Sequence, residues 1–151
     1  MPRVPSIYLD TCALIRLFDE GSQARVRAES HAVQEFLIHA SQRTVGWVVS
    51  EVLEAGIMDR RHTDRHPELL ELFKSSAEWI IMTDEAFRRA DFLEKLGYGA
   101  FDALHLACAE QALVDGLLTT DDRLIRRVQR GLGKSTIRVE NPVDWNRRLT
   151  P

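Results

Sequence analysis

Three aspartates stand at points of the sequence where a parallel sheet would bring them together. Asp10 directly follows a short apolar run, Asp121 directly follows another, and Asp102 opens the most apolar helical segment. If the runs are parallel strands, all three carboxylates fall on one carboxyl edge. Carboxylates about 4 Å apart repel by about 1 to 4 kcal/mol per pair, so a shared proton or a hard cation must offset the repulsion. The pattern favours bound Mg²⁺ or Mn²⁺, which can activate water for phosphodiester cleavage.

Each aspartate also fits a simpler role as a helix cap. An Asp before or within the first turn of a helix accepts backbone N–H bonds and complements the helix dipole. For any one of the three residues, capping is the better explanation. Capping does not require the residues to converge, however, so a metal site accounts better for all three together.

The elements that must position these residues alternate along the chain. Short apolar runs rich in β-formers predict strands at 6–9, 44–49, 79–82, 116–119 and 137–139. Amphipathic or apolar segments predict helices at 11–18, 24–42, 50–58, 67–76, 83–96, 100–114, 122–130 and from 142. Strands that alternate with helices pair in parallel through right-handed crossovers. We therefore expect an α/β fold: a three-layer α/β/α sandwich around a parallel sheet of about five strands.

Length and composition indicate one globular domain over residues 1–151. Hydrophobic residues make up 44% and charged residues 28%, which excludes a disordered chain. No apolar run approaches the roughly 20 residues that a membrane span needs, and the N-terminus lacks the apolar stretch of a secretion signal. We expect a cytoplasmic protein without membrane contact, in which Cys12 and Cys108 are reduced.

The charge is unevenly distributed. The chain carries −3 overall, but residues 121–151 carry +4 and the first 120 residues carry −7. A basic segment on an acidic body can contact a phosphate backbone, which makes Arg123, Arg126 and Arg130 candidates for RNA contact. The alternative is an ordinary solvated helix face.

Three segments give the chain a family resemblance: Ile7-Tyr8-Leu9-Asp10-Thr11, residues 101–107 (FDALHLA) and residues 118–124 (LTTDDRL). In order and spacing they resemble PIN-domain proteins of the kind that includes VapC-type toxins of toxin–antitoxin systems. The resemblance implies a flavodoxin-like sheet and a Mg²⁺- or Mn²⁺-dependent endoribonuclease. It also implies Asp10, Asp102 and Asp121 as catalytic and metal-binding residues. RNA is then the substrate, a small antitoxin protein a partner, and a homodimer the expected assembly.

The resemblance adds further residues near the acids. Thr11 and Thr120 occupy positions where the family places hydroxyl groups, and Asp122 is a neighbouring candidate for the acidic cluster. His105 lies about one helical turn beyond Asp102 and can line the same site. A helical histidine beside a cluster is also commonly a hydrogen-bonded packing residue.

The chain departs from the family at the fourth acid. The family has a Glu in the helix that follows the second strand, six residues past the Ser that caps this helix. Counting from Ser50 leads to Gly56. Glu54 lies about 200° and Glu51 about 140° away around the helix, and we take Glu54 as the catalytic candidate and Glu51 as site-lining. Gly56 is expected to leave a gap where a carboxylate could sit, which predicts weakened activity.

Two alternatives to an active ribonuclease remain open. The first is a catalytically weak or inactive PIN-fold module that binds RNA or protein. The second is an unrelated Mg²⁺-dependent phosphotransfer protein. It is disfavoured because Thr11 and Cys12 follow Asp10, with no second acid two residues on.

Overall fold

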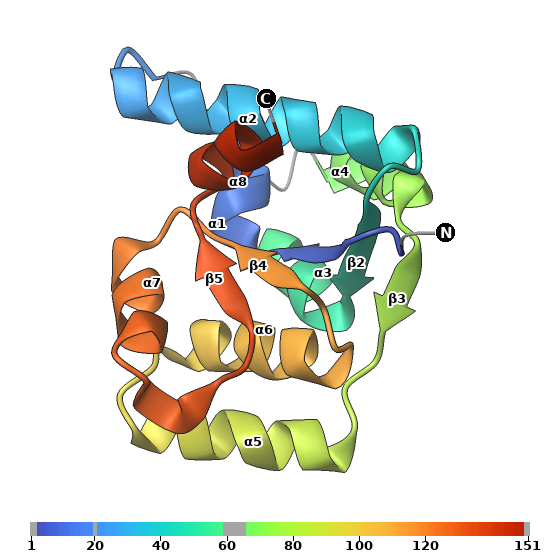
Figure 1. The fold of residues 1–151 in the computed structure, drawn as a ribbon. Coiled ribbons are helices and arrows are strands. Elements are labelled where there is room, and N and C mark those ends of the chain that lie inside the picture. Colours follow the sequence, from blue (N-terminus) through green and yellow to red (C-terminus); the bar gives the residue numbers. More distant parts are fainter. Residues whose placement is uncertain (1–2, 20, 59–65, 150–151) are drawn as a thin grey trace.

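A five-stranded parallel sheet lies at the centre of the computed structural model, which describes residues 3–19, 21–58 and 66–149 (Figure 1). The strands are β1 (Ser6–Leu9), β2 (Gly46–Ser50), β3 (Glu78–Ile80), β4 (Gly116–Leu118) and β5 (Arg138–Glu140), in the order β3-β2-β1-β4-β5. Every neighbouring pair is parallel. The predicted α/β/α sandwich with five strands is confirmed.

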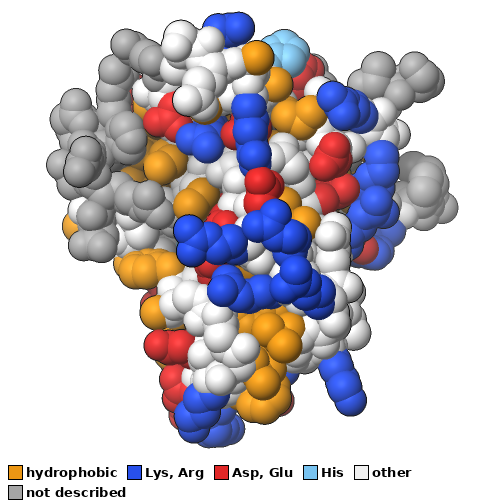
Figure 2. All heavy atoms as spheres, turned by 90° about the vertical axis from the view of Figure 1, so that its left-hand side faces the viewer, with side chains coloured by type: hydrophobic (Ala, Val, Ile, Leu, Met, Phe, Trp, Pro, Cys, Tyr) orange, Lys and Arg blue, Asp and Glu red, His pale blue; other side chains and the backbone are white. Residues whose placement is uncertain are grey.

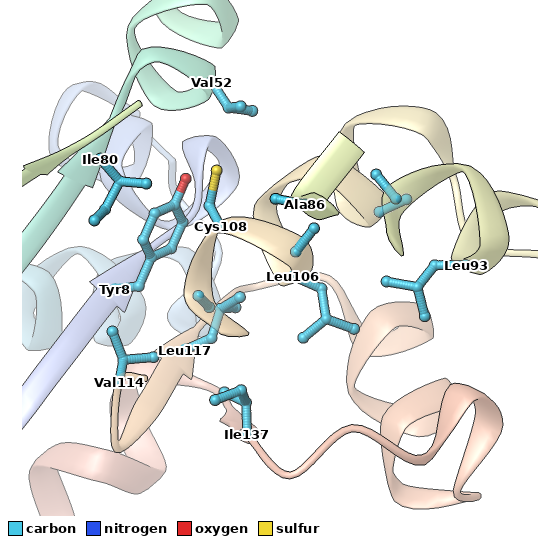
Figure 3. Close-up of a cluster of buried hydrophobic side chains, with 14 of the residues drawn as sticks. Tyr8, Val52, Ile80, Ala86, Leu93, Leu106, Cys108, Val114, Leu117 and Ile137 are labelled. Carbon is cyan, nitrogen blue, oxygen red and sulfur yellow. The ribbon is translucent and has the colours of Figure 1, made fainter. Parts of the chain in front are cut away.

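Side chains of the central strand alternate between two cores. Ile7 and Leu9 point to one face of the sheet, where they join Phe36, and Tyr8 points to the other, where it joins Leu117. All five are almost fully buried. Figure 3 shows Tyr8 with its phenol oxygen beside Cys108. Because successive strand residues face opposite ways, burial on both faces requires the continuous apolar runs seen in the sequence.

Helices cover both faces of this sheet. The helical elements are α1 (Thr11–Leu14), the 3₁₀ helix η1 (Ile15–Phe18), α2 (Ala24–Ser41), α3 (Glu51–Met58), α4 (His66–Leu72), η3 (Phe73–Ser75), α5 (Asp84–Lys95), α6 (Ala100–Gln111), α7 (Asp122–Gln129), η4 (Leu132–Lys134) and α8 (Pro142–Leu149). Helices α2 and α8 lie on one side of the sheet and α5 and α6 on the other (Figure 1). On the first side, Trp145 of α8 packs edge-on against Phe36 of α2, with ring centroids 5.3 Å apart. None of the described helices is long and apolar enough to cross a membrane.

The helix boundaries follow local capping chemistry. Ser50 accepts the N–H of Leu53, and Thr83 accepts the N–H of Ala86, as expected from residues that favour N-caps. Helix α6 ends at Gln111, earlier than the expected Val114. The reason is that Leu113 adopts a left-handed φ of 55°, and the N–H of Val114 bonds back to Ala109 to close the helix end.

The strand order reverses between β1 and β4. From β1 the chain proceeds outward through β2 to β3, and from β4 it proceeds the other way to β5. Ligand sites in parallel α/β sheets form at the carboxyl ends of strands beside such a reversal. Asp10 follows β1 and Asp121 lies three residues past the end of β4, so both belong to this part of the fold.

Candidate active site

Asp10 is the most buried acid at the carboxyl edge of the sheet. Its backbone N–H still pairs with Leu118 of β4, at 3.1 Å, which extends the sheet by one residue. Its Oδ1 accepts the N–H of Ala13 at 2.9 Å and so caps α1. The side chain is only 1% exposed, and no described residue makes a hydrogen bond to its Oδ2. A buried carboxylate oxygen without a donor is costly unless a cation or a proton joins it.

The surroundings of Asp10 raise its pKa to about 7. Burial is the main cause, because removal from water disfavours the charged form. The nearby Thr119 hydroxyl and the Ala13 amide lower the pKa in part, whereas the negative charges of Asp102 and Asp121 raise it. Asp102 and Asp121 therefore both lie close enough to Asp10 to act on it electrostatically.

Asp102 and Asp121 come from two helices that start at this edge. Asp102 lies in the first turn of α6, and Asp121 caps α7 by accepting the N–H of Arg123 at 2.9 Å. Capping and clustering thus occur together, since Asp10 also uses one oxygen as a cap. Within the described parts of the chain, no three His, Cys, Asp or Glu side chains are close enough to hold a metal ion jointly.

A pocket of about 260 Å³ opens beside Asp10. The residues that line it are Asp10, Thr11, Cys12, Gly56, Phe101, Asp102 and His105. The open Oδ2 of Asp10 and the carboxylate of Asp102 are hard oxygen donors of the kind that Mg²⁺ and Mn²⁺ bind. Mg²⁺ commonly uses one or two carboxylates and keeps several waters, so this donor set fits such an ion without a closed cage.

Two core residues join the site through His105, and the motif-based prediction missed both. The Nδ1 of His105 lies 2.6 Å from the phenol oxygen of Tyr8, which lies 2.6 Å from Oγ of Ser50. The Nε2 of His105 lies 3.1 Å from Oγ1 of Thr11. Tyr8 has the pattern of a core strand residue and Ser50 that of a helix cap, so only their tertiary partners reveal this second role.

Gly56 lines the pocket, as its place in the helix predicts, but it leaves no gap for a carboxylate. A Cβ atom at this position would lie 2.3 Å from Oγ1 of Thr11, and real Cβ atoms do not approach other atoms so closely. The Thr11 hydroxyl fills the volume that a side chain at 56 would need. The expectation of an empty ligand position at Gly56 is corrected accordingly.

The remaining sequence candidates lie outside the residues that line the pocket. Glu51 accepts the N–H of Met82 at 3.0 Å and so ties α3 to the end of β3. Glu54 is half-buried on α3. Thr120 is buried, and its carbonyl accepts a hydrogen bond from Arg25 at 3.2 Å. Asp122 forms a two-pronged ion pair with Arg25, both bonds at 2.8 Å, and this hydrogen bonding lowers its pKa.

A buried glutamate holds the arginines next to this edge. Glu29 of α2 is 1% exposed and binds Arg16 at 2.9 Å, Arg25 at 3.1 Å and the amide of Asn141 at 2.6 Å. Buried charges need such pairing, because an isolated one is strongly penalised. Arg25 precedes Glu29 by one helical turn, but Arg16 and Asn141 come from other parts of the chain, and the residue pattern carries no signal for these two.

The predicted RNA-contact arginines are on the surface of α7 and at its end. Arg123 and Arg130 are exposed, and Arg126 lies between them along the helix. Figure 2 shows the face on the left of Figure 1, where Lys and Arg side chains gather in a band beside acidic ones. The face that carries this band is the side of the molecule on which α7 lies (Figure 1), and contact of its arginines with RNA stays a prediction.

Comparison with known protein families agrees with this geometry. The model of the PIN domain family matches residues 7–131, a range that contains all three aspartates. The chain belongs to the PIN domain family. PIN domains are generally nucleases that use divalent metal ions. A search of curated proteins finds no match to the chain.

Proposed function

We propose that this PIN domain is a Mg²⁺- or Mn²⁺-dependent endoribonuclease. The observation that carries the proposal is the buried Oδ2 of Asp10, which lacks a hydrogen-bond donor, on a residue that lines a pocket shared with Asp102. A carboxylate in that state is poised for a cation, because the ion offsets both its burial and the repulsion from its acidic neighbours.

Asp10 and Asp102, which line the pocket, are the residues that would hold the ion, and the charge of Asp121 would add to its attraction. Such an ion, when bound, lowers the pKa of its water and stabilises the charge that builds up on a phosphodiester during cleavage. The exposed arginines of α7 would bind the phosphates of single-stranded RNA. They position the substrate without reading its sequence.

We further propose that the protein is the toxin of a VapBC-type pair. The support is the similarity of its three aspartate motifs to VapC-type toxins. A small antitoxin would then be its protein partner and a homodimer its working form. Co-purification of the chain with a small neighbouring gene product, and release of nuclease activity when that product is removed, would test this assignment.

Cleavage of a closed circular single-stranded RNA tests the nuclease proposal directly. Only an endonuclease can open a circle, and the wild-type protein should do so in Mg²⁺ or Mn²⁺ but not in EDTA. Asp10→Asn should abolish cleavage. Asp91→Asn, the same change at an exposed site on α5, is the matched control and should cleave normally. A circle opened equally well by Asp10→Asn and the wild type would refute the proposal.

Metal binding has its own readout in thermal stability. A cation that binds only the folded state raises the melting temperature by mass action, to an extent set by its concentration relative to its Kd. The wild type and Asp91→Asn should show this rise, and Asp10→Asn should lose most of it. An equal rise in all three proteins would place the ion elsewhere.

A second candidate function is RNA binding without cleavage. It is favoured by the spacing of the acids, which form no joint ligand group within the described residues. It is also favoured by Gly56, because the Thr11 hydroxyl fills the volume that an acidic side chain at this position would need. RNA that binds with micromolar affinity but stays intact in every divalent ion would support this candidate over the nuclease.

A further inference from the structure

A series of four buried side chains runs from the core to the pocket. It begins at Ser50, passes through Tyr8 and His105, and ends at Thr11, and each member is at most 3% exposed. The elements that carry these residues are far apart in the sequence. A hydrogen-bonded series of this kind couples the proton positions along its length, because each group can donate only the protons it has.

The acid and base strengths of the groups favour one direction for the series. The phenol oxygen of Tyr8 and Nδ1 are 2.6 Å apart, Nε2 and Oγ1 of Thr11 are 3.1 Å apart, and either partner could donate at these distances. The phenol is the most acidic O–H of the series and the imidazole nitrogen its strongest base, so the favoured donor to Nδ1 is the phenol. A neutral ring then carries its proton on Nε2, which donates to Thr11.

The other end of the series is compatible with this direction. Ser50 accepts the N–H of Leu53, and its own proton can be donated to Tyr8. Burial raises the pKa of the Tyr8 phenol above its usual value, so the phenol keeps the proton that it donates to His105.

The consequence appears at Thr11. When Oγ1 accepts from His105, the O–H of Thr11 remains available as a donor. Gly56 makes this arrangement possible, since any Cβ there would displace the hydroxyl. The pocket residues therefore include an acceptor without a donor, Asp10 Oδ2, and a hydroxyl that can donate, that of Thr11.

We propose that His105 and Tyr8 are positioning residues that hold the Thr11 hydroxyl as a hydrogen-bond donor to a phosphate oxygen of the bound nucleic acid. This inference rests on the proposed nuclease function and extends it. The pocket then has two complementary sides, with carboxylates for the cation and a neutral donor for the phosphate. The chain uses the space of a fourth acid for this donor.

The tautomer can be measured without metal or activity. Nitrogen NMR of the ¹⁵N-histidine-labelled, metal-free protein separates protonated from unprotonated ring nitrogens, and His105→Asn identifies the signals of this ring. At neutral pH the Nε2 signal should be protonated and the Nδ1 signal unprotonated. Tyr8→Phe, which keeps the ring, should convert this into a mixture of tautomers. A wild-type ring protonated on Nδ1, or on both nitrogens, overturns the inference.

The donor role is tested by affinity for a short single-stranded RNA in EDTA. A hydrogen bond to a charged phosphate is worth about tenfold or more in affinity. Thr11→Val, which replaces the hydroxyl by a methyl group, should lose about that factor, whereas Thr11→Ser should stay within about twofold. Tyr8→Phe should show an intermediate loss.

Two outcomes separate this inference from the proposed function. In the first, the wild type cleaves RNA, but Thr11→Val and Thr11→Ser lose equal affinity for it. This result overturns the donor role of Thr11 and is consistent with the proposed nuclease function. A wild type that neither binds nor cleaves RNA overturns the nuclease proposal and the phosphate contact together, while the imidazole signals still decide the tautomer.

Discussion

Asp10 should make the stability of the metal-free protein fall as pH rises. Its pKa is about 7 in the folded chain, against an ordinary value of 3.8 in an unfolded one. Below about pH 4 both states hold the proton, so Asp10 costs nothing. Between about pH 4 and 7 the unfolded state releases it while the folded state keeps it, which favours unfolding. Stability present at low pH is therefore lost as pH rises through this window.

The size of this loss follows from the two pKa values. A rise from 3.8 to about 7 corresponds to about 4 kcal/mol in the free energy of unfolding, at about 1.4 kcal/mol per pKa unit. Asp10→Asn cannot ionise and escapes the loss. The free energy of unfolding of the variant, relative to the wild type, should thus increase by about 4 kcal/mol between about pH 4 and pH 8.

Urea unfolding in EDTA at several pH values measures this difference. Other titrating groups are common to both proteins, so their contributions cancel, as does any constant cost of the amide in the buried site. A difference between variant and wild type that stays within about 1 kcal/mol over the whole pH range would show that Asp10 has an ordinary pKa and would refute the reasoning.

Three further predictions concern other parts of the molecule. Charge reversal of Arg126 and Arg130 should weaken RNA binding and reduce the slope of log K for RNA binding against log salt by about one to two. Fluorescence anisotropy measures both, and an unchanged slope would indicate that the two arginines contact only solvent. Gly56→Ala should destabilise the chain by about 1–2 kcal/mol in urea unfolding, because crowding against Thr11 outweighs the helix propensity of alanine; a stabilised variant would contradict this. The Cys108 thiol, whose pKa is raised to about 12 by burial, should resist alkylation at pH 8 in native protein, with mass spectrometry as the readout; rapid labelling would show that it is accessible.

Features that depend on local pattern could be predicted from the residues alone. The five apolar runs indicated the strands, because burial on both faces of a parallel sheet leaves no polar alternation to obscure them. Ser50 and Thr83 marked two helix starts through their capping preference. The expectation that Asp10, Asp102 and Asp121 lie near one another followed from the alternation of strands and helices.

Features that depend on packing between distant segments could not be predicted in this way. Asp122 was expected near the acidic cluster, but Arg25, 97 residues away, holds it in an ion pair. The role of Gly56 depends on the position of the Thr11 hydroxyl in another helix. Neither contact has a signature in spacing or composition, because both arise only when helices from separate parts of the chain pack together.

The packing of α8 sets where this domain can be cut. The family match ends at residue 131, but β5 and α8 follow it. A fragment ending there would expose the backbone of β4 as a new sheet edge and leave Phe36 without the indole of Trp145. It would also remove Asn141 from the buried carboxylate of Glu29. Fragments that stop at the family boundary should therefore aggregate on expression, whereas those that run through Leu149 keep these contacts.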